Sequence, residues 1–244
     1  AVPPPPTWHS LMDFLVDGLD EAARLIASGD EQVLDATGRT LSISLSAVFL
    51  AVLLGLPIAA CLARRRFFGH RLLLTGFRSL LGVPTVFLGL ICFGLFSRRG
   101  PLGPLDLLYT PTAIVFGETL LALPIIVALA HGALTALDPR VSETSRTLGA
   151  GRLRRLLTDF SEARTGLFLA VLTAFARCST ELGIAMMVGG NLKDRTRTLS
   201  TATALETGKG EFAVGLAMGG LLLLLATGMT LLVGLVGREK RTDR

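Results

Sequence analysis

Three residues that are charged at neutral pH, Glu118, Arg177 and Glu181, stand well inside long apolar runs of this chain, where a charge is costly to place. Arg177 and Glu181 lie four residues apart, so on a helix they share one face and can form an ion pair. Glu118 stands in the preceding apolar run and is expected at a comparable depth, because consecutive spans cross in opposite directions. Charged side chains at membrane depth face other protein segments or a water-filled path. Two interpretations follow: a neutralised pair that holds helices together, or the lining or gate of a path.

Prolines, methionines and glycines in the same runs bear on that path. Pro84 and Pro124 each leave backbone carbonyls without a helical partner, which is tolerated where protein or water satisfies them. Simple kinks and gating hinges are both open interpretations of these prolines. The fourth run ends on a Met-Met-Val-Gly-Gly stretch, in which methionines fill core space and paired glycines permit close helix approach or a turn. The residues assigned to a candidate path are Glu118, Arg177, Glu181, Pro84, Met187, Gly189 and Gly190.

The chain lacks the sequence patterns of enzymes and metal sites. Its nearest approach to a phosphate-binding loop, Thr-Gly-Lys-Gly at 207–210, lacks the leading glycine and the Ser or Thr after lysine. None of the three histidines is paired with carboxylates at ligand spacing. Cys61, Cys92 and Cys178 lie singly in apolar runs and are expected to be small buried hydrophobes. We expect no catalytic residue, no metal site and no bound cofactor, so any energy source must come from another chain.

Composition and hydropathy indicate a membrane protein. Half of the 244 residues are hydrophobic and the mean hydropathy is +0.60, which is high for a soluble domain. Five apolar runs approach the roughly 20 residues that cross a bilayer as a helix. They are Thr40–Ala63, Leu80–Ser97, Pro111–Leu134, Gly166–Gly190 and Glu211–Gly237. The expected fold class is therefore all-α, a polytopic membrane protein with about five transmembrane helices. For the second run, an alternative places Leu72–Leu81 along the inner surface.

The distribution of basic residues predicts the orientation. More than half of the 24 Lys and Arg residues follow the first run, separate the third from the fourth, or form the tail. Short cytoplasmic loops are enriched in basic residues, so these segments should lie inside. The odd number of runs then places the N-terminus outside and the C-terminus in the cytoplasm. The net charge of +5 sits in these loops rather than on one basic face, which argues against nucleic acid as a partner.

The segments that flank the apolar runs complete the expected organisation. Residues 1–39 combine a solvated polyproline stub, which lacks a signal-peptide pattern, with an amphipathic helix over Trp8–Leu34. That helix is expected to rest on the bilayer or on the spans, and a ligand role for its carboxylates is the alternative. Residues 40–237 form the transmembrane domain, with a loop at 138–165, and 238–244 form a basic cytoplasmic tail.

A basic, helix-prone segment, Ser142–Arg164, separates the third and fourth apolar runs. Asp138 and Pro139 provide a helix start just before it, and Gly149 allows a turn after which a second short helix follows at an angle. Leu148 is one of several apolar residues that give the segment a side for docking. On charge alone, a docking surface for a soluble partner and a solvated loop that only fixes the topology are equally good interpretations.

The start of this segment resembles the cytoplasmic coupling motif of ABC importer permeases: Glu, two small residues, Arg or Lys, Thr, Leu and Gly. The corresponding residues are Glu143, Thr144, Ser145, Arg146, Thr147, Leu148, Gly149 and Ala150. Thr144 and Ser145 replace the usual alanines, and Phe160–Arg164 stands where an Ile-x-Leu-Pro ending is usual. That ending resembles the tungstate permease branch, as do Met186–Asn191 and Thr203–Gly210, and the resemblance covers nearly the whole chain.

This resemblance implies a fold, partners and a cargo. The fold is that of a type I ABC importer permease, a homodimer surrounded by lipid in the bacterial cytoplasmic (inner) membrane. Two ABC ATPase subunits, which hold ATP and Mg, would grip the Glu143–Ala150 segment from inside, and an external binding protein would deliver tungstate. Arg177 would attract the oxyanion and Glu181 would limit how tightly it binds. Molybdate or sulfate as cargo, and an intramembrane enzyme or scaffold, are the alternatives.

Overall fold

The computed structural model describes residues 16–238 apart from 17–18, 21–22, 25–26 and 66. These residues form helices and connecting loops, and no strand occurs among them, which confirms the expected all-α class. The helices are α2 (Glu31–Arg64), α3 (His70–Leu80), α4 (Thr85–Phe96), α5 (Pro111–Thr135), α6 (Pro139–Thr147), α7 (Arg152–Glu162), α8 (Arg164–Ser179), α9 (Leu199–Lys209) and α10 (Phe212–Arg238). A 3-10 turn, η1 (Gly103–Leu105), and a π-helical turn, η2 (Ala185–Gly189), complete the set. The predicted polyproline stub, most of the predicted N-terminal amphipathic helix and the end of the basic tail lie outside the described residues.

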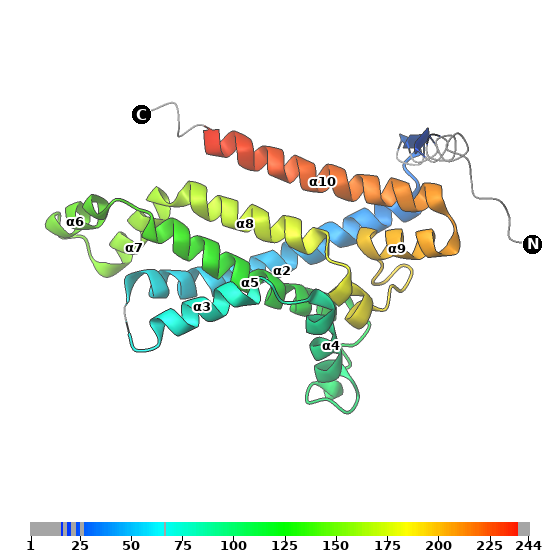
Figure 1. Cartoon of the computed structure of the whole chain (residues 1–244), viewed down its shortest axis with the longest axis horizontal. Coiled ribbons are helices and arrows are strands. Elements are labelled where there is room, and N and C mark those ends of the chain that lie inside the picture. Colours follow the sequence, from blue (N-terminus) through cyan, green and yellow to red (C-terminus); the bar gives the residue numbers. More distant parts are fainter. Residues whose placement is uncertain (1–15, 17–18, 21–22, 25–26, 66, 239–244) are drawn as a thin grey trace, which may run out of the picture.

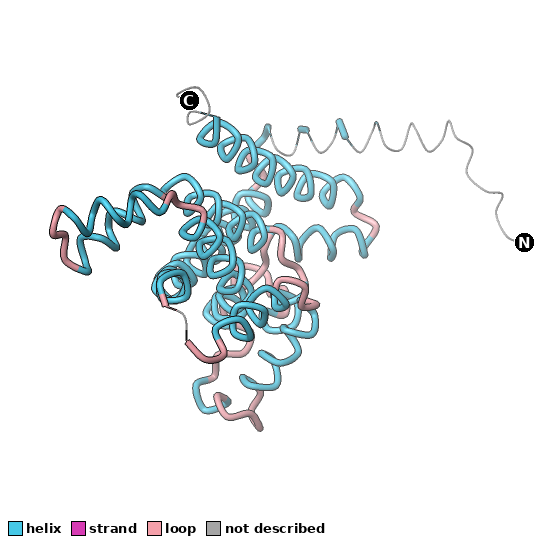
Figure 2. Tube along the Cα trace, turned by 60° about the vertical axis from the view of Figure 1, so that its left-hand side comes forward, coloured by secondary structure: helices cyan, strands magenta, loops and turns pink. Residues whose placement is uncertain are grey.

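The long helices α2, α5, α8 and α10 run along the longest axis of the molecule (Figure 1). Helix α2 packs against α5 and α8, and α10 packs against α8 and α9. Helices α6 and α7 extend beyond one end of this bundle, and α9 lies at the opposite end (Figures 1 and 2). The predicted coupling segment and the loop before α9 are therefore separated by the length of the bundle.

Helix α2 begins before the start that the sequence predicted for the first span. Asp30 caps its N-terminus, because its carboxylate accepts hydrogen bonds from the backbone N–H groups two and three residues on, at 3.0 and 3.2 Å. The helix then continues to Arg64 without a break at the predicted boundary, Thr40. Gly29 has a positive φ of 67° just before the cap. Leu34 therefore belongs to α2 and not to the predicted N-terminal amphipathic helix.

Small residues bring α2, α5 and α8 close together and form the core of the bundle. Ala51 of α2, Ala122 and Ile126 of α5 and Ala174 of α8 are buried in one cluster. Gly55 of α2 faces the same side chain: a Cβ added to it would lie 2.8 Å from Ile126 Cγ2. Lipid gives helices no hydrophobic drive to associate, so close van der Waals packing of this kind holds the bundle together. Among the described residues, α2 and α5 are each long and apolar enough to cross a membrane.

The second predicted span is sharply bent. Helices α3 and α4 together are apolar enough to cross a membrane, but they are bent by 101° at the break between them. Pro84 stands at this break in an extended conformation. Because proline has no N–H with which to continue a helix, α3 ends before it and α4 begins after it. Helix α3 packs beside α5 and runs with the long helices, whereas α4 turns away from them (Figure 1). Leu72–Leu81 lies in and just after α3, which contacts α5 but has no buried residue, so the alternative of a position along the inner surface stays a prediction.

The fourth predicted span, Gly166–Gly190, is not a single helix. Helix α8 ends at Ser179, and the chain regains helical geometry only at 183, just before η2. The Thr180 hydroxyl donates to the carbonyl of Ala176 at 3.0 Å and so offers the backbone a local alternative to the helix. The fifth predicted run agrees closely with α10, which ends at Arg238. Hydropathy did not reveal the break because the apolar residues before Arg177 and after Glu181 make the whole run look like one span.

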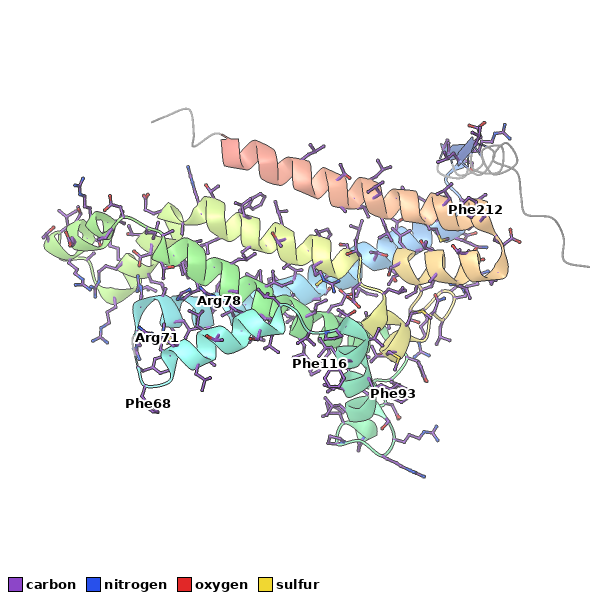
Figure 3. All side chains as sticks on the ribbon, viewed as in Figure 1. Phe68, Arg71, Arg78, Phe93, Phe116 and Phe212 are labelled. Carbon is purple, nitrogen blue, oxygen red and sulfur yellow. The ribbon has the colours of Figure 1, made fainter. Side chains whose placement is uncertain are left out.

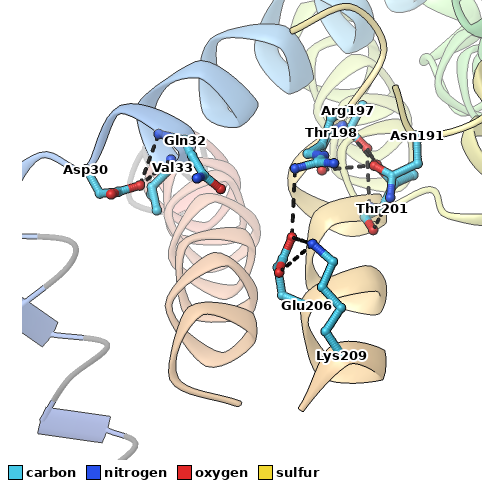
Figure 4. A network of polar contacts seen from close by, with 9 residues as sticks. All are labelled: Asp30, Gln32, Val33, Asn191, Arg197, Thr198, Thr201, Glu206 and Lys209. Atoms are coloured by element: carbon cyan, nitrogen blue, oxygen red, sulfur yellow. Dashed lines mark hydrogen bonds and ion pairs between the residues drawn. The ribbon is translucent and has the colours of Figure 1, made fainter. Parts of the chain in front are cut away.

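Polar contacts fasten the loop before α9 to that helix at one end of the bundle (Figure 4). Glu206 is buried, and its carboxylate accepts from Lys209 Nζ at 3.0 and 3.1 Å and lies 3.7 Å from Arg197 Nη1. Asn191 Nδ2 donates to the carbonyl of Thr201 at 3.2 Å. An ion pair to a buried carboxylate is broken only at a large cost, so this end of the molecule is well fixed.

The prediction that all three cysteines are buried is wrong for one of them. Cys92 and Cys178 are buried, but Cys61 is exposed. It lies in the last turns of α2 and lines a cavity beside α7, whereas its neighbours Ala60 and Leu62 are buried. All three are free thiols.

Candidate functional site

The breaks in the second and fourth spans lie against each other. Gly183 packs on the start of α4: a Cβ added to it would lie 2.9 Å from Val86 N and 3.0 Å from Thr85 Oγ1. Gly89 of α4 packs on the same break, since a Cβ there would lie 3.1 Å from the Gly183 carbonyl oxygen and from Ile184 Cα. Backbone atoms do not move aside as flexible side chains do, so glycine is required at both positions. Two broken helices thus cross where each leaves helical geometry.

A cavity of about 430 Å³ lies beside this crossing. Its lining residues are Thr85, Val86, Arg177, Thr180, Glu181, Leu182, Gly183, Met186 and Met187. The structure therefore brings together three residues that the sequence assigned to a path, namely Arg177, Glu181 and Met187. Pro84 directly precedes Thr85 and sets the start of α4 at the cavity. We call this space the crossing cavity.

Arg177 and Glu181 form an ion pair inside the broken fourth span, with Nη1 2.8 Å from Oε2. The Glu181 side chain is 1 % exposed, whereas that of Arg177 is 41 % exposed. The other carboxylate oxygen of Glu181 accepts from the backbone N–H of Ile184 at 3.1 Å, and its carbonyl accepts from Ser200 Oγ at 2.7 Å. Glu181 therefore caps the segment after the break. The ion pair itself joins no second helix, so stapling of neighbouring helices does not describe it.

Apolar side chains make up most of the lining of the crossing cavity, and its few polar groups can donate hydrogen bonds, apart from the buried Glu181 carboxylate. Arg177 has five N–H donors, and among the described residues only one is used, by Glu181. The first N–H groups of α4 have no carbonyl partner within that helix and carry its partial positive charge. Thr85 adds a hydroxyl at the same helix end. Glu181 offsets the positive charge of Arg177, so an anion finds hydrogen-bond donors here without a strong net charge that would hold it tightly.

Sequence reasoning missed six lining residues of this cavity: Thr85, Val86, Thr180, Leu182, Gly183 and Met186. Three of them, Thr85, Thr180 and Gly183, have a signal in hindsight. A helix must begin anew after Pro84, which places Thr85 in its first turn. Thr180 and Gly183 flank the pair Glu181-Leu182, and a threonine and a glycine so close together weaken a helix from both sides. What the sequence does not contain is the contact of Gly183 with α4.

Glu118 lies in α5 outside the lining of the crossing cavity. Its side chain is buried, and its Oε2 atom has no hydrogen-bond partner among the described residues. The Cys178 thiol lies 3.7 Å from the Glu118 carbonyl oxygen, and Glu181 is near enough for the two carboxylates to repel each other when both are charged. Glu118 and the segment around Cys178 thus lie close together, but Glu118 does not line the cavity, and the depth of these residues in a membrane stays a prediction.

Gly189 and Gly190 also lie away from the crossing cavity. A Cβ on Gly189 would lie 2.6 Å from Ile114 Cδ1, and one on Gly190 would lie 2.7 Å from the Tyr109 ring. Gly190 has a positive φ of 68° and ends η2. Of the two roles that the sequence allowed these glycines, the structure shows both: close helix approach at the first and a turn at the second.

The predicted coupling segment forms α6 and the turn after it, beyond the end of the bundle (Figures 1 and 2). The Asp138 carboxylate caps α6 by accepting from the Arg140 N–H at 2.9 Å. Gly149 has a positive φ of 70° and ends the turn, after which α7 begins at Arg152. Glu143, Thr144, Arg146, Thr147, Leu148 and Gly149 are exposed, Ala150 is partly exposed, and Ser145 is buried. The segment is therefore accessible to a partner, with Ser145 as the one residue that turns inward.

The exposed face of this segment is partly apolar. Leu148 is 79 % exposed, and Leu153 of α7 also projects from the molecule. A cavity of about 570 Å³ separates α6 from α7 and is lined by Thr144, Leu148 and Arg154 among others. Exposed leucines on a short charged helix are costly in water unless a partner covers them, which favours the docking interpretation over that of a solvated loop.

Comparison with known proteins identifies the family. The tungstate uptake system permease protein TupB of Campylobacter jejuni is 38 % identical over 215 residues, covering 88 % of this chain and 90 % of the relative. TupB of Peptoclostridium acidaminophilum is 33 % identical over 215 residues, covering 88 % and 94 %. The molybdenum transport system permease protein ModB of Escherichia coli K12 is 29 % identical over 191 residues, covering 72 % and 83 %. No protein-family model matches the chain.

Solved structures agree with this relationship at the level of the fold. A chain of the inward-facing MetNI methionine ABC transporter superposes with a TM-score of 0.66 at 17 % identity, covering 84 % of this chain and 96 % of that one. The bent second span, the broken fourth span and the projecting α6 therefore belong to an ABC importer permease fold. On the identity and coverage of its TupB relatives, the chain belongs to the family of tungstate uptake permeases of ABC transporters.

Proposed function

We propose that this chain is the membrane-spanning subunit of an ATP-driven importer that carries tungstate into the cell. The observation that carries the proposal is the pairing of two features in one chain. One is the exposed α6 turn, which has the residues of a coupling motif; the other is a cavity of anion-binding character at the crossing of two broken spans. The TupB relatives, named for tungstate uptake, support tungstate as the cargo.

The partners follow from the two ends of the bundle. An ABC ATPase subunit, holding ATP and Mg, binds the Glu143–Ala150 segment on the cytoplasmic side, which is also where the Arg-rich loops lie. A tungstate-binding protein docks at the opposite, external end, near α9. This orientation places the N-terminus outside and the C-terminus inside the bacterial cytoplasmic membrane. The fixed network of Arg197, Glu206 and Lys209 gives that external end the rigidity that a docking surface needs.

A second copy of the chain completes the path. Helix α4 turns away from the bundle and exposes Val86, Phe87, Leu90 and Ile91, which a homodimer partner or lipid must cover. The crossing cavity lies at the start of the same helix, so two copies that meet through α4 would place their cavities near a common path. Arg177 then attracts the oxyanion and Glu181 keeps it from binding tightly, because a permanent site would hinder release.

Movement reaches the spans through α7. When ATP closes the two ATPase subunits, α6 is displaced, and α7 moves with it because the two helices pack together. Arg64 at the end of α2 pairs with Asp159 of α7, with Nε 3.1 Å from Oδ2. A displacement of α7 is thereby passed to α2, which packs along α5 and α8 and so bears on the crossing. This chain supplies no chemistry of ATP hydrolysis.

The test is transport by a reconstituted complex. The chain is expressed with a candidate ATPase, purified and placed in vesicles with the tungstate-binding protein enclosed on the external side. We expect co-purification and ATP-dependent movement of tungstate, with molybdate and sulfate as weak competitors. Preference for molybdate would reassign the cargo, an outcome that the ModB relatives make worth measuring. Activity of the isolated chain without an ATPase would reject the proposal in favour of an intramembrane enzyme.

Orientation has an internal probe. Cys61 is exposed near the α6 end of the bundle, whereas Cys92 and Cys178 are buried. In vesicles diluted with phosphatidylcholine, a membrane-impermeant maleimide should therefore label the native chain at one position, when the vesicles are inverted and not when they are right-side-out. The reverse pattern would place α6 outside the cell and out of reach of any ATPase.

A further inference from the structure

A second cavity, of about 1030 Å³, lies at the α6 end of the bundle. It is bounded by the last turns of α2 and α5 and by α6 and α7. It is separate from the crossing cavity, with which it shares no lining residue. Its position is where the hydrocarbon spans end and the charged helices begin, so we call it the interfacial cavity.

Arginines dominate the charge of the interfacial cavity. Five line it: Arg64, Arg65, Arg146, Arg152 and Arg155. Only Arg64 has an acidic partner among the described residues, Asp159, and the one other acidic lining residue, Asp138, caps α6. The Arg155 Nε atom is buried and has no hydrogen-bond partner in the described part of the chain. A buried guanidinium donor without an acceptor is costly, and an anion that accepts from Arg155 Nε would remove that cost.

The opposite lining of the interfacial cavity is apolar. Pro57 and Ala60 of α2, Leu134 of α5 and Leu156 of α7 form part of it, together with Leu137 in the turn before α6. A small inorganic oxyanion has no use for such a surface, because all its atoms are polar. A ligand that fills both linings must carry a negative charge at one end and hydrocarbon at the other.

Aromatic residues place this end of the bundle at a membrane surface. Phe67 and Phe68 lie in the turn between α2 and α3, close in sequence to Arg64 and Arg65, and both are exposed. Figure 3 shows Phe68 at this turn. Arg71 of α3 projects from the same region (Figure 3). Exposed aromatic and basic side chains together are typical of the level of the lipid headgroups. The ligand of the interfacial cavity would therefore meet the protein from the bilayer.

We infer that the interfacial cavity binds an anionic phospholipid, with its phosphate among Arg65, Arg152 and Arg155 and its acyl chains against the leucines. Basic pockets between helices on the cytoplasmic side are a known setting for such headgroups. The lipid would lie between α7 and the ends of α2 and α5, so it would stiffen the joint through which α6 moves the spans. The inference does not depend on which anion is transported.

Cys61 lines the interfacial cavity and reports its occupancy in the native chain. The full chain is purified in neutral detergent, and alkylation of Cys61 by N-ethylmaleimide is followed while phosphatidylglycerol is added. We expect phosphatidylglycerol to slow the reaction, and phosphatidylcholine, inorganic phosphate and tungstate at equal concentrations to leave it unchanged. The buried Cys92 and Cys178 must stay unreactive throughout, which shows that the fold is intact.

Two variants separate the arginines from general surface charge. The double variant R152Q/R155Q should need about 30-fold more phosphatidylglycerol for half-protection, since each basic side chain near an anionic headgroup contributes about fivefold in affinity. R98Q/R99Q removes two exposed arginines from the loop after α4, outside the interfacial cavity, and should behave as the native chain. R65Q, a change at the end of α2, serves if the double variant exposes its buried cysteines.

Each outcome of these experiments either supports or overturns the lipid inference. Selective protection by phosphatidylglycerol that is lost in R152Q/R155Q or weakened in R65Q supports the inference. Protection by phosphate or tungstate would show a free oxyanion site instead, and equal protection by phosphatidylcholine would show that the lipid charge is irrelevant. An equal loss of phosphatidylglycerol protection in R98Q/R99Q would overturn the inference. Protection of Cys61 by the ATPase subunit, with none by phosphatidylglycerol, would also overturn it.

Discussion

The crossing of the broken spans is tightly packed, whereas the α6–α7 end of the molecule exposes apolar and basic side chains. At the crossing, Gly89 and Gly183 bring backbone against backbone within about 3 Å of where a Cβ would stand. At the α6–α7 end, Leu148 and Leu153 are exposed, and arginines face a large cavity. The first region leaves no room for substitution, and the second is open to partners. A permease needs both, because a displacement of α6 and α7 can move the spans only if the helices at the crossing are rigidly packed.

Disrupting the close packing at the crossing should have the largest effect on stability and on tungstate uptake. Gly183→Ala places a Cβ 2.9 Å from Val86 N, so α4 must separate from the break. We expect a loss of about 1–3 kcal/mol in the free energy of unfolding and loss of tungstate uptake. Gly94→Ala, on the same α4 but with no atom within 4 Å of the added Cβ, should gain about 1 kcal/mol from helix propensity and keep uptake. Thermal unfolding and vesicle uptake of both variants measure this, and equal behaviour would deny the crossing its role.

The Arg177–Glu181 pair distinguishes structure from transport within the crossing. Arg177→Gln leaves a buried carboxylate without its charge partner, which should destabilise by about 1–2 kcal/mol, less than for a fully buried pair because the Arg177 side chain is 41 % exposed. The double variant R177Q/E181Q removes the stranded charge and should recover most of that stability. If Arg177 attracts the oxyanion, uptake stays at background in the double variant although assembly with the ATPase returns. Recovery of uptake together with stability would show that the pair is only structural.

The two regions also differ in how far the sequence predicts them. The α6 segment was predictable because its signals are local: an Asp-Pro start, basic residues, a glycine turn and a coupling motif within a few residues. The apolar runs were predictable for the same reason, and α5 begins where the sequence places it. Only the inward turn of Ser145 departs from the expected exposed segment, because α6 packs one side against α7.

The crossing depends on contacts between residues that are far apart in the chain. Hydropathy makes Gly166–Gly190 look like one helix, and nothing local shows that Gly183 must accommodate the start of α4. Glu118 depends on distant contacts in the same way. The sequence predicts the apolar run in which it lies, but its burial outside the cavity lining follows from the packing of α5 against α8. The exposure of Cys61 likewise depends on the cavity that lies between the end of α2 and α7.

Substitutions at the α6–α7 end should leave the stability of the chain unchanged but weaken its binding to the ATPase. Leu148→Asp removes apolar contact area from the coupling segment, which a docked partner would bury. We expect ATPase binding to weaken about 30-fold, equivalent to about 2 kcal/mol of lost burial, with no change in the thermal unfolding of the isolated chain. Leu157→Asp, an exposed leucine of α7 that lines neither of its cavities, is the matched control and should bind normally. Equal weakening in both variants would mean that general surface apolarity, not the motif, holds the ATPase.

The smallest effect should come from the joint between the two regions. Asp159→Asn breaks the ion pair with Arg64, both partly exposed, and costs about 0.5–1 kcal/mol, so folding and ATPase binding should survive. The consequence should instead appear in coupling, because α7 then moves without carrying α2: ATP turnover persists while the tungstate delivered per ATP falls by a factor of about two to five, the factor that this energy corresponds to. The swapped pair R64D/D159R restores the contact and should restore the ratio. A normal ratio in Asp159→Asn would show that motion reaches the crossing by way of α8, which follows α7 directly in the chain, rather than through α2.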